Sequence, residues 1–202
     1  YPRTLGQIAA HIAAKAGFAL AADFTNADVS IPQKPDWGTL SLRGALGCAA
    51  SAAACFTRIG RSGALEFVPV NDPATPYSLP AANTLSRVYG ETAFGALKAL
   101  VVTQRGKNAA ETEQTFAEDG AVESDGNALR VHGNPLLPAN AAHTATLAAG
   151  MLAALKGMTL TRAQVVWQGD PTLTVGRRVN IIDHTGAETL TVENDRLSLS
   201  FD

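Results

Sequence analysis

Residues 134–183 are the most informative part of the chain for the fold, because turns and apolar runs alternate along them in a defined order. The segment contains no candidate catalytic residue. The block opens with Asn134-Pro135-Leu136-Leu137, passes through a helical stretch, and continues with Val165-Val166-Trp167-Gln168-Gly169-Asp170-Pro171, Thr174-Val175-Gly176 and Val179-Asn180-Ile181-Ile182-Asp183. In the helical stretch, apolar side chains recur on one face up to the stop at Gly157. Proline, glycine and aspartate separate the later apolar runs, which is typical of short strands. The block indicates a structural module.

The composition limits the class of protein. The chain has 202 residues, of which 46% are hydrophobic and 17% charged, so it is expected to be globular, with one large domain or two small ones. A formal net charge of -2, without a lysine or arginine cluster, argues against nucleic-acid binding. The sequence has no apolar run of about 18 residues, so no membrane-spanning segment is expected. It starts Tyr1-Pro2, without an initiator methionine or a signal peptide, which predicts a processed product or a segment of a larger protein.

The first 72 residues predict a small α+β domain. Thr4 and Gln7 have the spacing of a capping box, and Ser41 can cap a second helix. Two β-prone runs flank the turn Gly60-Arg61-Ser62-Gly63 and predict a hairpin. The expected order is a helix ending at Gly17, strands over 18–23 and 28–31, a helix after Ser41, and a hairpin of 55–59 and 64–68.

A proline-punctuated linker over 73–84 is expected to separate this domain from a mostly antiparallel β-barrel or sandwich over 85–202. One helix, over 140–156 and capped by Asn140, is expected to lie across the second domain. The overall fold class predicted is therefore α+β. The strands expected in the second domain span 96–104, 114–117, 128–132, 162–167, 177–182, 187–193 and 197–201.

No residue pattern in the chain carries the signature of a catalytic or metal site. The four histidines have no spacing typical of metal ligands, and His184 lies in a predicted turn. Both cysteines are expected on one face of the second helix, too far apart for a disulfide, as small buried residues. These residues are His11, His132, His143, His184, Cys48 and Cys55.

Other candidate groups also favour structural interpretations. The acidic run that starts at Glu111 and ends at Asp125 lacks apolar neighbours that would desolvate a catalytic carboxylate, so it is expected to be a solvated loop. The glycines at 169, 176 and 186 are spaced as turns between strands rather than as a phosphate-binding loop. Trp37 and Trp167 could line a binding surface or belong to ordinary cores. The prediction is a protein without catalytic, cofactor-binding or metal-binding residues.

The order of these motifs resembles the tail hub, or baseplate-hub-like tail tip, proteins of long-tailed bacteriophages and prophages. The similarity rests on the segment starting at Asn134, the turn Gly169-Asp170-Pro171, and the final run Asn194-Asp195-Arg196-Leu197-Ser198-Leu199. The N-terminal Thr4-Leu5-Gly6-Gln7-Ile8-Ala9 and the strand Phe94-Gly95-Ala96-Leu97-Lys98-Ala99-Leu100-Val101-Val102 agree with it. The chain departs from the pattern at Asp170, where asparagine is usual, and at Arg177, where aspartate is usual, which puts charge-dependent contacts at those turns in doubt.

The resemblance implies a non-enzymatic virion component, made in the cytoplasm of a bacterial host and located at the tail tip. Such hub proteins are homotrimers that connect the tail tube to the tip or the host-recognition apparatus. The implied partners are therefore further copies of the chain and other tail tube and tail tip proteins.

Two alternatives from other classes are open. Residues 1–70 also resemble the short N-terminal domain of secretins and siderophore receptors, a peptide- or signal-binding periplasmic module. That likeness leaves the second domain unexplained. A cell-wall hydrolase would require a catalytic constellation, which the sequence does not show.

Overall fold

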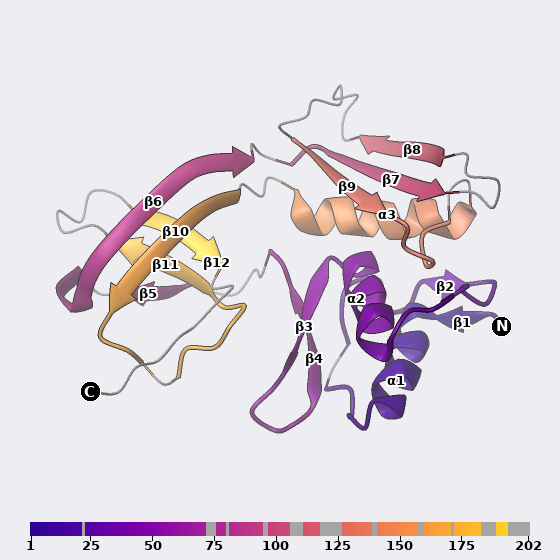
Figure 1. Ribbon diagram of the computed structural model, residues 1–202, viewed down its shortest axis with the longest axis horizontal. Helices are drawn as coiled ribbons and strands as arrows, with labels where there is room; N and C mark the ends of the chain where they lie inside the picture. The colour runs from indigo at the N-terminus through magenta and orange to yellow at the C-terminus, as the bar shows by residue number, and fades with distance from the viewer. Residues whose placement is uncertain are drawn as a thin grey trace. The chain divides into compact units, whose positions relative to one another are not determined.

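The computed structural model describes residues 1–21, 23–71, 76–79, 81–94, 97–105, 111–117, 127–138, 141–156, 160–170, 172–182 and 189–193. The chain divides into two compact units, each made of two chain segments. Unit 1 consists of Tyr1–Pro69 and Ala96–Met158, and unit 2 of Val70–Gly95 and Thr159–Asp202. Figure 1 labels the elements of both.

The N-terminal part of unit 1 confirms the predicted helices and hairpin. Helix α1 (Leu5–Lys15) starts with the expected capping box, in which the Thr4 hydroxyl accepts from the Gln7 N–H and the Gln7 side chain accepts from the Thr4 N–H. Helix α2 (Leu42–Ala52) is capped by Ser41. Strands β3 (Cys55–Ile59) and β4 (Leu65–Pro69) pair antiparallel, and Gly63 has the positive φ that their turn requires.

Two other elements of this region are shorter than the sequence suggests. Strand β2 (Ser30–Ile31) pairs with β1 (Arg3–Thr4), so the predicted strand over 28–31 shrinks to two residues. The prediction of a strand over 18–23 is wrong for its described residues, which form a single bridge between Leu20 and Leu65. The apolar run there packs beside the hairpin without a full ladder of its own.

The second segment of unit 1 is a three-stranded sheet with a helix against it. Strand β7 (Ala99–Arg105) lies between β8 (Glu111–Ala117), which is antiparallel to it, and β9 (Ala128–His132), which is parallel to it. Helix α3 (Ala142–Leu155) runs along this sheet, as Figure 1 shows. The expected cap, Asn140, lies outside the described residues.

The Asn134-Pro135-Leu136-Leu137 segment ties the two parts of unit 1 together. The buried Asn134 side chain donates to the carbonyl of Cys48 in α2 over 2.8 Å and accepts from the Leu136 N–H over 3.0 Å. Leu136 and Leu137 are almost fully buried. Because both the amide nitrogen and the amide oxygen of Asn134 form a hydrogen bond, the turn can be buried without the cost of an unpaired amide.

Asn26 makes a second link inside unit 1. Its amide nitrogen donates to the carbonyls of Ala52 in α2 and Leu147 in α3, over 2.9 and 3.0 Å. Its backbone φ is 64°, a left-handed conformation that asparagine tolerates better than most residues. The side chain lies so close to Gly150 that a Cβ there would collide with it. The small residue in α3 therefore makes room for the amide.

Unit 2 contains two small sheets. Strands β6 (Thr84–Phe94) and β10 (Leu160–Trp167) pair antiparallel with three register irregularities. Strand β11 (Arg178–Ile182) lies between β12 (Thr189–Glu193), antiparallel, and β5 (Tyr77–Leu79), parallel; a short 3-10 helix, η1 (Ala81–Asn83), precedes β6. A small core forms around Leu79, Leu173, Val179 and Ile181.

The α+β class is confirmed, with helices and mostly antiparallel strands in small sheets. A closed barrel over 85–202 is not formed by the strands that the structure describes, because they are divided among separate sheets. The helix expected over 140–156 is present as α3, and within unit 1 it packs against β7 and β8. The predicted strand over 197–201 lies outside the described residues.

The prediction that both cysteines lie on one helix is wrong, and one long strand was not predicted. Helix α2 ends at Ala52, so Cys55 belongs to β3 and not to the helix that holds Cys48. Strand β6 was not predicted, and β5 lies within the expected linker. The division into domains over 1–72 and 85–202, joined by a linker over 73–84, stays a prediction.

Candidate functional site

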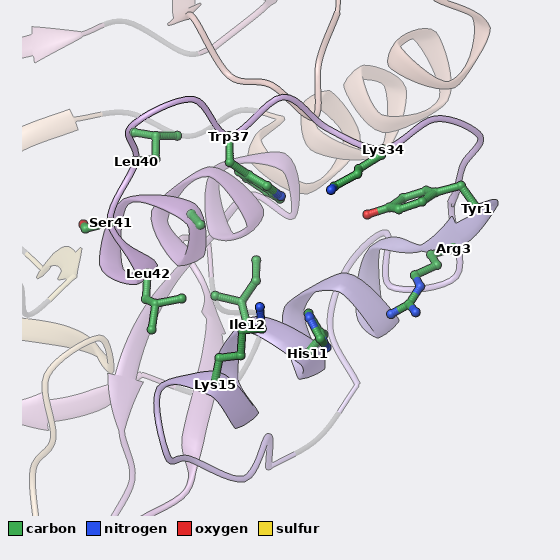
Figure 2. Close-up of a pocket in the computed structure, with 11 residues that line it drawn as sticks. Tyr1, Arg3, His11, Ile12, Lys15, Lys34, Trp37, Leu40, Ser41 and Leu42 are labelled. Carbon is green, nitrogen blue, oxygen red and sulfur yellow. The ribbon is translucent and has the colours of Figure 1, made fainter.

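A cleft of about 480 Å³ lies in unit 1 among the described residues. Helix α1, the segment over 34–42 and the start of α2 form its walls, as Figure 2 shows. The lining residues are Tyr1, Arg3, His11, Ile12, Lys15, Lys34, Trp37, Leu40, Ser41, Leu42 and Ala45. All of them come from the first segment of unit 1, so the cleft needs no contribution from unit 2.

The charged groups of this cleft are cations. Arg3, Lys15 and Lys34 line it, and none of the described aspartates and glutamates does. The Arg3 guanidinium lies 6.0 Å from the centroid of the Tyr1 ring, within the range of a cation–π contact. The acid next to the cleft in sequence, Asp36, uses a carboxylate oxygen to accept from the Gly38 N–H over 3.1 Å. The cleft therefore concentrates positive charge on a protein whose formal net charge is -2.

Apolar side chains form the floor and part of the rim of the cleft. Ile12 and Ala45 are buried at the base, and Trp37 is half-buried beside them. Leu40 and Leu42, by contrast, are 46% and 43% exposed at the rim. In Figure 2 the Trp37 ring and the Lys34 amine project toward α1 from the opposite wall. A recess of this kind suits a ligand that has both an apolar part and negative charge.

A second surface lies on the β6–β10 strand pair of unit 2. Val88 stands opposite Gln164, and Ser86 stands opposite Val166, so these four side chains share one face. Val88 and Val166 are 63% and 47% exposed, and Leu85 on the same strand is 68% exposed. In the described part of the chain, β6 and β10 pair only with each other, so each presents an outer edge. Exposed edges and aliphatic side chains favour pairing with another strand.

A polar cluster fixes one turn of unit 2. The Asp170 carboxylate accepts from the hydroxyl and N–H of Thr172 and from the Tyr77 hydroxyl, the last over 2.8 Å. These hydrogen bonds, led by those from Thr172, lower the pKa of Asp170, and the bond to Asp170 raises the pKa of Tyr77. The Arg177 guanidinium lies 5.6 Å from the Tyr77 ring centroid. Asp170 and Arg177, the two departures from the tail-protein pattern, are thus linked through Tyr77.

The histidines and cysteines considered as candidate site residues lie in different parts of the described structure and do not form one site. His11 lines the cleft, His132 lies in β9, and burial lowers the pKa of His143 in α3. Burial raises the pKa of the Cys55 thiol to about 11 and also raises that of Cys48, and both cysteines are free. His184 lies outside the described residues.

The acidic segment, the glycines and the tryptophans are equally dispersed. The prediction of a loop is wrong for Glu111 and Glu113, which lie in strand β8, and Glu113 pairs with Arg130 over 2.7 Å. Residues 118–126 and Gly186 lie outside the described part of the chain. Among the residues that are described, no group of three histidine, cysteine or acidic side chains could hold a metal ion, and no helix is long and apolar enough to cross a membrane. Of the two tryptophans, Trp37 lines the cleft and Trp167 packs on the small core of unit 2.

The sequence pointed to Trp37 but missed the rest of the cleft. Its cations come from Arg3, Lys15 and Lys34, which are scattered singly along the first segment. Their convergence depends on how α1 packs against the 34–42 segment, so no local motif reveals it. A possible signal was the imbalance of six lysine and arginine residues against three aspartates in residues 1–65.

Comparisons with known proteins place the fold. No protein-family model matches the sequence, and a search of curated proteins finds no relative. Among solved structures, the fold is similar to that of a tail protein from Neisseria meningitidis MC58, with a TM-score of 0.53 and 13% sequence identity over 94% of this chain. It is also similar to the 43 kDa tail protein of prophage MuSo2 from Shewanella oneidensis, with a TM-score of 0.52 and 13% identity over 95% of this chain. The chain spans 60% of the length of each of these two proteins.

Proposed function

We propose that the chain is a non-enzymatic structural component of a phage or prophage tail. The observation that carries this proposal is the fold, which it shares with two tail proteins over nearly its whole length. The alternative, a peptide- or signal-binding periplasmic module, drew on residues 1–70 alone and accounts for neither the β7–β9 sheet nor unit 2. The implied site of action is the virion, after synthesis in the bacterial host.

Within that role, the chain acts as a ring-forming hub, with the homotrimer as its assembled state and tail tube and tail tip proteins as neighbours. The β6–β10 pair supports this finer proposal, because its outer edges and its exposed Leu85, Val88 and Val166 could pair with strands of adjacent copies. Repeating such a contact around an axis closes a ring without any catalytic group.

The experiment measures the assembled mass of the chain by sedimentation velocity over a range of concentrations. The wild-type chain is expected to approach a trimer as concentration rises. Val88→Asp with Val166→Asp should leave it monomeric at the same concentrations, because charged side chains would be desolvated in the contact. Both side chains are exposed, so the monomer should keep its fold.

Ile59→Asp is the matched control. Ile59 is also an exposed aliphatic residue on a strand, at 50% exposure, but it lies in unit 1. It is expected to leave the assembled mass unchanged. A wild-type chain that stays monomeric at the highest concentrations, or an Ile59→Asp variant that dissociates as completely as the double variant, would count against the ring.

A further inference from the structure

The cleft of unit 1 has the chemistry of a docking site, and none of its lining residues belongs to the strands proposed to form the ring. We infer that it binds an acidic peptide segment of a partner protein, with an aliphatic or aromatic side chain of that segment on the floor between Ile12 and Trp37. The shape of the cleft, its charge and the exposure of its rim support this binding, which does not depend on ring formation.

The apolar part of the cleft accounts for the anchor. A volume of about 480 Å³ is within the range of pockets that enclose a ligand group, and the buried Ile12 and Ala45 give it an apolar base. The eight large hydrophobic side chains exposed among the described residues include Tyr1, Leu40 and Leu42, which all line this cleft. A partner that covers Leu40 and Leu42 would remove apolar surface from water, which favours binding.

The cations that line the cleft favour a partner segment with negative charge. Lys15 stands on the α1 side and Lys34 on the opposite wall, so carboxylates on both sides of an anchor side chain could each meet an amine (Figure 2). Arg3 adds a third cation near the Tyr1 ring. Asp36, the nearest acid in sequence, is not among the lining residues. A basic segment would meet three like charges here, and a neutral apolar one would leave the cations unpaired.

A mixed apolar and cationic surface distinguishes a peptide from other anions. Nucleic acids and anionic lipid surfaces are held mainly through rows of phosphate contacts, which would need a continuous basic stripe. The cations of this cleft instead surround a recess with aliphatic walls. This combination favours a segment in which acidic and apolar residues alternate.

The test uses the full chain and a short fluorescein-labelled peptide in which leucine and phenylalanine alternate with glutamate and aspartate. Fluorescence anisotropy is expected to show saturable binding that weakens as salt is added. The same peptide with glutamine and asparagine in place of the acids should bind about tenfold more weakly or worse, because the charge pairing is lost. A peptide with serine in place of leucine and phenylalanine should lose affinity to a similar degree.

The variant that tests the cleft is Lys15→Glu with Lys34→Glu, and Lys98→Glu, which makes one such charge reversal outside the cleft, is a control to be compared also with Lys15→Glu alone. All three lysines are exposed in unit 1, so none of these changes removes a core contact, and Lys98 does not line the cleft. The double variant should weaken peptide binding by about tenfold or more, whereas Lys98→Glu should change it less than about twofold. Circular dichroism before each titration confirms that the variants are folded.

Several outcomes would overturn the proposal. Unchanged affinity in the double variant would show that the peptide binds elsewhere, and an equal loss in Lys98→Glu would show an effect of net charge alone. Equally tight binding of the serine peptide would contradict the proposal that an apolar side chain of the peptide occupies the floor of the cleft. Phosphatidylglycerol vesicles or a short DNA duplex that bind in a Lys15- and Lys34-dependent way, while the peptide does not, would assign the cleft to another class of partner. Loss of self-association in the double variant would make the occupant a second copy of the chain.

Discussion

The two units differ in how completely their side chains are buried. Unit 1 packs α3 against the β7–β8 strands, and its Leu136 and Leu137 are 0% and 1% exposed. In unit 2 the described core is the cluster around Leu79 and Ile181, while Leu85 on the longest strand remains 68% exposed. The difference teaches that unit 1 has an extensive interior of its own, although Leu40, Leu42 and Ile59 are exposed on it, whereas the described part of unit 2 has a small core and carries its exposed aliphatic side chains on the β6–β10 pair.

The largest effect expected from this contrast is on unit 1. Leu136→Ala removes a fully buried side chain and should lower the free energy of unfolding by about 2 to 5 kcal/mol, because it loses burial and leaves a cavity. Urea denaturation followed by far-ultraviolet circular dichroism measures the change.

Leu85→Ala is the matched control, since it makes the same substitution in unit 2 at an exposed position. At concentrations where the chain is monomeric, it should change the free energy of unfolding by less than about 0.5 kcal/mol. Equal losses of unfolding free energy in Leu136→Ala and Leu85→Ala would contradict the difference in burial between the two units.

A smaller effect is expected at the Asn26 link. Asn26→Ala removes two hydrogen bonds, to the carbonyls of Ala52 and Leu147, and should lower the free energy of unfolding by about 1 to 3 kcal/mol. Because Asn26 has a positive φ, alanine would also be strained there.

Asn26→Gly separates these two causes, since glycine accepts the positive φ but cannot make the hydrogen bonds. If the bonds dominate, the glycine variant should be destabilised nearly as much as the alanine variant in the same denaturation experiment. If the glycine variant is as stable as the wild type, the destabilisation of the alanine variant comes from backbone strain alone, and the hydrogen bonds of Asn26 to α2 and α3 do not stabilise unit 1.

The elements that the sequence predicts well are those set by neighbouring residues. The Thr4–Gln7 capping box, the Ser41 cap and the turn with Gly63 each depend on residues within a few positions, and each is found where it was expected. The segment beginning at Asn134 was also identified as informative, although its bond to the Cys48 carbonyl, 86 positions away, could not be foreseen.

The elements that the sequence misses are those set by distant partners. Strand β6 shows no clean alternation of buried and exposed side chains, because Leu85, Ser86 and Val88 are all exposed. The buried face of helix α3 follows from the spacing of its apolar residues and is confirmed at Leu147, Met151 and Leu155, but the sequence does not reveal which sheet that face meets. The cleft was missed for the same reason, since its cations meet only after α1 and the 34–42 segment have packed.

The smallest effect expected is the pH response of the Asp170 turn in unit 2. Hydrogen bonds from Thr172 and Tyr77 lower the folded-state pKa of Asp170 below the value of about 3.9 that an unfolded aspartate has. Its contribution to stability is therefore complete well above pH 4 and is lost as the pH falls through the lowered pKa. The contribution should be small, because the group is at the surface, where water screens it.

Asp170→Asn tests this response, since asparagine keeps an oxygen for the Thr172 donors but carries no charge. The melting temperature of the wild type should exceed that of the variant at pH 7, and the gap should narrow as the pH falls toward about 3. Trp167, which packs on the core of unit 2, reports the transition if both proteins also carry Trp37→Phe. A gap that stays constant between these pH values would mean that the Asp170 charge does not stabilise the turn. Unit 2 would then depend on its apolar cluster, with the exposed β6–β10 face left as the place where neighbouring chains could add stability.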